Sequence, residues 1–192
     1  FFNTPAELFE NGIRELKGAG LDFRRHKSEV KEYFDRKFEE GFPGYICMLD
    51  NPLPYQMSEG YTCMLAQNIM NNKQFDEFFW PYLKRMVDET AERGGVHWSY
   101  TEGSIMRFTD YFNDLPKGSF ATMLEQDDIF EFRKACPNTA VCGGISVDML
   151  GGGTKEECVD TAKKLIEEIG TGLVICSNKS LNYLRDGKSE NI

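Results

Sequence analysis

The sequence lacks several features that would place it in a familiar class. Its six cysteines form no Cys-x-x-Cys pair and no spacing typical of a disulfide framework, so we expect reduced thiols in a cytoplasmic protein. No apolar run approaches the roughly 20 residues that a membrane-spanning helix needs. Positive charge is scarce, since 22 basic residues face 31 acidic ones, a net charge of −9. This balance argues against nucleic-acid binding and against docking on anionic membranes, because both need excess cations.

Apolar and aromatic residues are plentiful instead. Hydrophobic residues make up 41% of the 192 residues and aromatic ones 13%, including 15 Phe, which predicts a large core or a roomy apolar cavity. This length suits one domain or a large part of a bigger one. The sequence shows no signal peptide. It starts at Phe1 and not at Met, so we expect the true start to lie upstream.

The first 60 residues predict helices and one strand. Thr4–Glu7 has the form of a capping box, with a proline at the first helical position. A second helical stretch is expected to end at Gly41, and the apolar run 45–49 predicts a short buried strand. Further on, apolar residues at helical spacing from Phe75 to Val87 predict one long helix that ends at Gly94.

The rest of the chain alternates strand and helix. The predicted strands are 96–101, 120–124, 140–142 and 173–176, and the predicted helices are 104–113, 127–135 and 154–169. Repeated βα units imply parallel strands with right-handed crossovers. Four such strands fit the second half of a (β/α)8 barrel or a doubly wound sheet. Both folds collect their chemistry at the carboxyl ends of the strands.

This rule selects a small set of candidate residues at strand ends. They are Glu102, Gly103, Glu125, Gln126, Gly143, Gly144, Cys176, Ser177 and Asn178. Glu102 is read as a metal ligand or general base, with an ion pair to Arg107 as the alternative. Arg107 is read as a clamp for an anionic ligand group, with the same ion pair as its alternative.

The other candidates also keep two readings. Glu125 or Gln126 is expected to point into the cavity, whereas Asp127 or Asp128 is better explained as a helix N-cap. Cys176 is read as a zinc thiolate or as a buried thiol. Gly143 and Gly144 either admit a ligand close to the backbone or form a tight turn.

Several phrases of the sequence, in order, resemble the uroporphyrinogen decarboxylase superfamily, closest to its branch of cobalamin-dependent methyltransferase-like proteins. They are Gln74–Lys84, Glu102-Gly103-Ser104 with Arg107, Leu115–Gly118, Leu124–Asp128, Gly143-Gly144, Gly153–Glu157, Gly170–Ile175 and Ser189-Glu190-Asn191. The resemblance covers residues 66–192. It implies a single (β/α)8 TIM-barrel domain over residues 1–192, apparently incomplete, with mainly the C-terminal half represented.

Such barrels take about 250 residues, so we expect missing segments before about residue 66, on the order of a hundred residues between Gly41 and Met64. The alternative is a naturally shortened half-barrel with open edges.

The resemblance also bears on metal binding. Zinc-dependent members of the superfamily have a His-x-Cys pair and a distant Cys, for which this chain has His97-Trp98-Ser99 and Cys176. Strand alternation puts His97 on the face opposite to Glu102, so we expect His97 to be packed rather than metal-bound. If zinc is present, Glu102 and Cys176 are the ligands that this sequence offers.

The resemblance implies a methyltransferase that moves a methyl group between a small donor or acceptor and a corrinoid (cobalamin) at the barrel mouth. Glu102, Arg107 and Gln126 would be its catalytic residues, and Glu125, Gly143, Gly144 and Asn178 would bind substrate or cofactor. A corrinoid protein is the implied partner. One alternative is a decarboxylase acting on a tetrapyrrole, for which Arg107 and Lys179 supply few cations. The other is a non-catalytic relative that binds a corrinoid protein.

Overall fold

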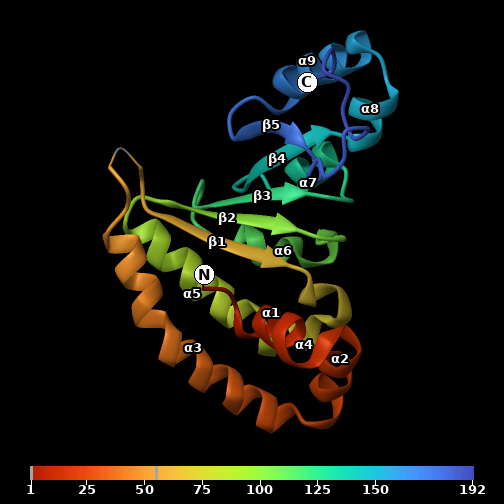
Figure 1. Cartoon of the computed structure of the whole chain (residues 1–192). Helices are drawn as coiled ribbons and strands as arrows, with labels where there is room; N and C mark the ends of the chain where they lie inside the picture. The colour runs from red at the N-terminus through yellow and green to blue at the C-terminus, as the bar shows by residue number, and fades with distance from the viewer. Residues whose placement is uncertain (1, 55) are drawn as a thin grey trace.

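A parallel sheet organises the protein. The computed structural model describes residues 2–54 and 56–192, in which five strands form one sheet in chain order. The strands are β1 (Glu59–Met64), β2 (Val96–Thr101), β3 (Phe120–Leu124), β4 (Ala140–Ile145) and β5 (Leu173–Ser177). Each neighbouring pair is parallel (Figure 1). This confirms an α/β fold with the architecture of a partial TIM barrel, and it adds β1 to the four predicted strands.

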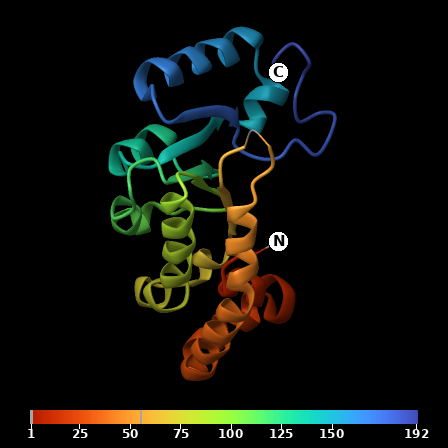
Figure 2. The same ribbon diagram turned by 90° about the vertical axis from the view of Figure 1, so that its left-hand side faces the viewer.

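Helices precede the sheet and connect its strands. They are α1 (Pro5–Phe9), η1 (Glu10–Arg14), α2 (Glu15–Arg25), α3 (Lys27–Asp50), η2 (Ala66–Ile69), α4 (Asn72–Phe78), α5 (Trp80–Glu92), η3 (Met106–Phe108), α6 (Thr109–Asn113), α7 (Ile129–Ala135), α8 (Val147–Gly152) and α9 (Lys155–Ile169). Helix α5 packs on β1 and β2, and α3 packs on α5, so the β1 end of the sheet is thickly covered (Figures 1 and 2). Helix α9 packs on β4 and β5 at the other end.

Helix α3 corrects the prediction for the N-terminal segment. It runs unbroken through Gly41 and Pro43, so the predicted helix end and the predicted strand 45–49 are both wrong. Its buried residues recur at spacings of four, three and four: Phe38, Phe42, Tyr45 and Leu49. That period belongs to a helix face, and it continues through the apolar run that resembles a strand when read alone.

Helix termini confirm some predictions and overturn others. Thr154 and Glu157 form the predicted capping box of α9, and Asp128 caps α7 by accepting from two backbone N–H groups. The first predicted box does not form, because Glu7 turns into the core instead. The predicted helix over 75–87 is interrupted at Phe79, so that α4 ends there and α5 begins just before Pro81.

The two faces of the sheet have different environments. On β2, His97, Ser99 and Thr101 are buried under helices, whereas Trp98 and Tyr100 face the concave side and are half-exposed. Aromatic rings fill the helix side; the ring centroids of Phe75 and Phe108, for example, lie 3.9 Å apart. The concave side is therefore the more accessible face, as in the half of a barrel whose interior is open.

Two further predictions concern missing segments of the chain and membrane-spanning helices. Missing segments are expected before about residue 66. That stretch includes Phe1 and Tyr55, which lie outside the described residues, and the expectation stays a prediction. Among the described helices, none is both long enough and apolar enough to cross a membrane.

Candidate active site

Four of the predicted residues line one hollow at the carboxyl ends of β3 and β4. The hollow has a volume of about 210 Å³ and is lined by Glu125, Gln126, Gly144 and Asn178, among others. Asn178 uses both amide atoms to fix this end of the sheet. Its Nδ2 donates to the Glu125 carbonyl at 3.1 Å, and its Oδ1 accepts from the Val147 N–H at 3.1 Å. Gln126 is exposed and free to meet a ligand.

Glu125 joins three strand-end loops. Its Oε2 accepts from the Gly103 N–H at 2.9 Å, and its Oε1 lies 3.1 Å from the Lys179 ammonium. Burial alone would raise the pKa of Glu125, but the Gly103 N–H and Lys179 outweigh it and lower the pKa. Glu125 is therefore an ionised group that holds loops in place and is poorly suited to donate a proton.

Glu102 lies beside a different group of residues. Its carbonyl accepts from Gln67 Nε2 at 2.7 Å, and its Oε1 accepts from Cys63 Sγ at 3.7 Å. Arg107 does not pair with it; the guanidinium donates to the Gln67 carbonyl and lies 4.6 Å from the Phe108 ring centroid. Glu102 therefore does not form the ion pair with Arg107 that was its alternative interpretation. Arg107 instead binds the Gln67 carbonyl, and the Gln67 side chain binds the Glu102 carbonyl.

Sequence reasoning missed a buried carboxyl group next to Glu102. Glu7 is 1% exposed, and its Oε1 accepts from the backbone N–H groups of Leu65 and Ala66, both at 2.8 Å. Burial raises the pKa of Glu7 to about 8, even though these two hydrogen bonds lower it. The charges of Glu10 and Glu102 also raise it. The pattern Thr-Pro-Ala-Glu hid this role, because it is equally the pattern of a capping box.

Unpaired acceptors surround this carboxyl group. Among the described residues, four buried oxygen atoms of this region have no hydrogen-bond partner: Thr4 Oγ1, Glu7 Oε2, Glu10 Oε2 and Gln67 Oε1. Burial and the Glu102 charge also raise the pKa of Glu10. Glu7 and Glu10 therefore hold their protons more tightly than exposed carboxyl groups do.

His97 is packed on the far side of β2, as predicted. Its Nε2 lies 2.8 Å from Thr62 Oγ1, and its Nδ1 lies 3.1 Å from the Tyr45 hydroxyl. Complete burial lowers the pKa of His97 to about 3, so the ring is neutral at physiological pH. The structure confirms that His97 is a core residue.

The two glycines near the end of β4 favour the turn reading over ligand access. Gly143 and Gly144 have φ values of +121° and +92°, which side chains rarely adopt. A Cβ on Gly144 would lie 2.5 Å from Leu165 Cδ1 on α9, so Gly144 allows α9 to approach the sheet. A Cβ on Gly143 would have the Leu124 carbonyl oxygen as its nearest neighbour, at 3.6 Å, so backbone conformation rather than crowding favours glycine there.

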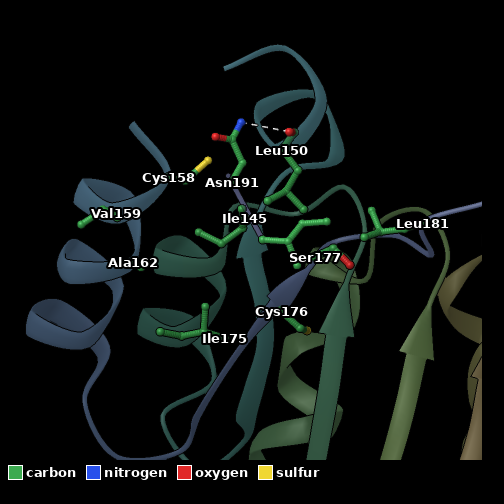
Figure 3. Close-up of a pocket in the computed structure, with 11 residues that line it drawn as sticks. Ile145, Leu150, Cys158, Val159, Ala162, Ile175, Cys176, Ser177, Leu181 and Asn191 are labelled. Carbon is green, nitrogen blue, oxygen red and sulfur yellow. Dashed lines mark hydrogen bonds between the residues drawn. The ribbon is translucent and has the colours of Figure 1, made fainter. Parts of the chain in front are cut away.

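A larger hollow lies at the β5 edge, away from these carboxyl groups. It has a volume of about 400 Å³ and lies between β5, α8, α9 and the C-terminal segment, where Asn191 donates to the Leu150 carbonyl at 3.0 Å (Figure 3). Its lining is mainly aliphatic, and the described residues that form it include no acidic, histidine or basic side chain. This groove offers apolar contact and no acid–base side chain.

Comparison with known proteins supports the fold. A sequence model of the uroporphyrinogen decarboxylase (URO-D) family matches residues 63–177. The chain belongs to the uroporphyrinogen decarboxylase family. Among solved structures, a methyltransferase from Methanosarcina mazei is similar with a TM-score of 0.70 and 13% sequence identity. The match covers 96% of this chain and 54% of that one, so this chain spans about half of the methyltransferase's length.

The family membership confirms the resemblance read from the sequence. At 13% identity the methyltransferase shows that the fold is shared and says nothing more about this chain. A comparison with curated proteins finds no match.

The zinc ligands expected from the URO-D superfamily do not come together in the structure. Strands β3 and β4 separate the end of β2 from β5, so the backbones at Glu102 and Cys176 lie roughly 14 Å apart, three strand spacings of about 4.8 Å. The Glu102 carboxylate accepts from Cys63, whereas Cys176 Sγ contacts Met123, so the two side chains have different neighbours. The described residues contain no group of three His, Cys, Asp or Glu side chains suited to a metal. The donor set does not fit zinc.

Proposed function

We propose that this URO-D family chain takes part in moving a methyl group between a small substrate and a corrinoid at the barrel mouth. The observation that carries the proposal is the pair of acidic side chains at the carboxyl ends of β1 and β2: the half-buried Glu102 and the buried Glu7, whose charges interact. Family membership and the fold shared with a methyltransferase support it. Because the chain spans about half of that methyltransferase, the activity is proposed for the complete barrel.

Proton supply is the chemistry that the mouth residues offer. When a methyl group leaves an oxygen, nitrogen or sulfur atom, that atom keeps the bonding electrons and takes up a proton; in the reverse transfer, from methylcobalamin, the same atom accepts the methyl group and gives up its proton. We assign this proton transfer to Glu102, which is half-buried at the end of β2. Glu7 acts on Glu102 through charge: its side chain accepts from the Leu65 and Ala66 N–H groups, and its proton limits the negative charge around Glu102 near neutral pH.

The remaining predicted residues take supporting roles in this proposal. Arg107 acts through Gln67, whose side chain holds the Glu102 carbonyl. Gln126 is exposed at the strand-end hollow and would contact the substrate, whereas Glu125 and Asn178 hold the loops. A bound corrinoid would supply the cobalt that carries the methyl group. The concave hollow has about 320 Å³, the low end of ligand pockets, so a corrinoid would lie over the strand ends rather than within the sheet.

The same residues weigh against the decarboxylase alternative. A tetrapyrrole with several carboxylates needs several cations around it. Lys179 is paired with Glu125, and Arg107 donates to a backbone carbonyl. Glu7, Glu10 and Glu102 supply no positive charge at the place where the tetrapyrrole would need it. A turnover assay distinguishes a methyltransferase from the non-catalytic alternative.

The test measures methyl transfer by the full-length protein with free methylcobalamin, and the change in cobalamin absorbance reports each turnover. We expect Glu102→Gln to lower kcat at least 100-fold, in the range of a lost general acid, while the melting temperature stays unchanged. Glu156→Gln, at an exposed position on α9, is the matched control and should keep full activity. Full turnover in Glu102→Gln would remove Glu102 from the reaction, and no turnover in the wild type would favour the non-catalytic alternative.

A further inference from the structure

Three sulfur atoms meet on the concave face of the sheet, away from the carboxyl cluster. They come from three adjacent strands: Met123 on β3, Cys142 on β4 and Cys176 on β5. Met123 and Cys142 are register partners, and Cys142 is also the partner of Val174, two residues before Cys176. All three side chains therefore point to the same face, and all three line the hollow of about 320 Å³.

The spacing of two of these atoms suits a shared metal ion, and Cys142 lies close enough to Cys176 for the two thiols to interact electrostatically. Cys176 Sγ lies 3.7 Å from Met123 Sδ. Two sulfur ligands, each about 2.3 Å from one ion, lie this far apart when the angle at the ion is near 107°. The free structure therefore already holds two sulfur atoms near the separation that a common ion would impose.

The lining of the hollow selects the kind of ion. The described residues that form it include no histidine and no carboxylate; besides the three sulfur residues they are Tyr, Trp, Ser and Val. Thiolate and thioether ligands together favour soft ions such as Cu(I), whereas Mg²⁺ and Ca²⁺ need oxygen ligands. Zinc sites usually add nitrogen or further thiolate ligands, which this lining does not supply.

A second observation points to a missing hydrogen-bond acceptor in this hollow. Trp98 Nε1 is a buried donor without a hydrogen-bond partner among the described residues, and Trp98 lines the same hollow. An unpaired buried N–H is costly, and an acceptor within the hollow would offset that cost. Metal-bound cysteines are thiolates, so an ion bound here would bring acceptor groups into the hollow that Trp98 lines.

We propose that Met123, Cys142 and Cys176 form a binding site for one Cu(I)-like ion. Two S–H bonds break, two metal–thiolate bonds form and one thioether coordinates, while the two protons pass to solvent; copper stays Cu(I) throughout. Because each cysteine must lose its proton to bind the ion, binding weakens as pH falls. The site is independent of the methyl-transfer proposal.

The test is an anaerobic titration of the full chain with Cu(I), in competition with a coloured Cu(I) chelator. We expect one ion per chain and absorbance in the near ultraviolet from sulfur-to-copper charge transfer. Cys142→Ser and Cys176→Ser should each weaken binding by roughly 100-fold, and Met123→Leu by roughly 10-fold, as for lost or mistuned ligands. Cys136→Ser is the matched control, because this buried cysteine lies outside the hollow.

A labelling experiment covers the case in which a variant fails to fold. Wild-type protein is treated with a thiol-alkylating reagent under mild denaturant, with and without Ag(I), and each cysteine is followed by mass spectrometry. Protection of Cys142 and Cys176 but not of the exposed Cys47 supports the site. Equal labelling of all three with and without Ag(I), or Cu(I) binding that survives in the Cys142→Ser/Cys176→Ser double variant, would overturn it.

Discussion

The two edge strands of the sheet, β1 and β5, have the same number of strand neighbours but very different surroundings. On β1 the helix-facing residues Gly60, Thr62 and Met64 are all buried beneath the helices of the N-terminal half. On β5, Val174 is 41% exposed on the concave face and Ile175 is 39% exposed on the opposite face. Helical cover, more than position in the sheet, therefore decides how much each edge contributes to stability.

The largest expected effect lies at the β1 edge and depends on pH. The pKa of Glu7 rises from 4.5 to about 8 on folding, so between these values the folded chain keeps a proton that the unfolded chain has lost. Stability should fall as pH rises through this range, by up to about 5 kcal/mol at 1.36 kcal/mol per unit, and be constant above it. Glu7→Gln should remove this slope in urea unfolding at pH 5.5, 7 and 8.5.

The control for this slope is Glu156→Gln, at an exposed position on α9. It should unfold like the wild type at every pH. A wild-type stability that is flat from pH 5.5 to 8.5 would contradict the buried, protonated state of Glu7.

The next effect comes from crowding under the same edge. A Cβ on Gly60 would lie 2.2 Å from both His97 Nδ1 and the Tyr45 hydroxyl. Gly60→Ala must push these groups apart and break a buried hydrogen bond, so we expect a loss of about 3 kcal/mol in chemical unfolding. Gly44→Ala on α3 meets no atom within 4 Å and should instead gain about 0.5–1 kcal/mol. Equal stability of the two variants would show that the β1 side is loosely packed.

The smallest effect is expected at β5 and comes from a matched pair of valines. Val141 on β4 is fully buried. Its register partner on β5 is Leu173, and the next residue, Val174, is 41% exposed. Val141→Ala should cost about 2 kcal/mol, because it leaves a cavity, and Val174→Ala less than about 0.5 kcal/mol. Thermal unfolding of the two variants measures both losses of stability. A cost at Val174 as large as at Val141 would mean that β5 is covered in solution.

Much of the sheet could be predicted because its signals are local. The predicted strands 96–101 and 120–124 match β2 and β3, and 140–142 and 173–176 match the first residues of β4 and β5. Turn residues and helix caps mark these boundaries within a few positions. Strand β1 was missed because its sequence, Glu-Gly-Tyr-Thr-Cys-Met, has only a weak apolar face.

The candidate site was predicted less completely, because its decisive contacts are not local. Strand ends correctly brought Glu125, Gln126, Gly144 and Asn178 to one hollow. The same rule placed Glu102 and Cys176 at one edge of the sheet but could not show that two strands lie between them. Glu7 could not be found at all, since its partners Leu65 and Ala66 lie in a distant segment.

The hydrogen bonds of Glu7 also carry a kinetic consequence. They join residues 58 and 59 positions apart, so forming them closes a long loop of chain. Such contacts form late, because the entropy of closing the loop must be offset by structure already present. We therefore expect the N-terminal segment to dock after β1 has formed. The protonation of the Glu7 side chain then sets how firmly the docked segment is held.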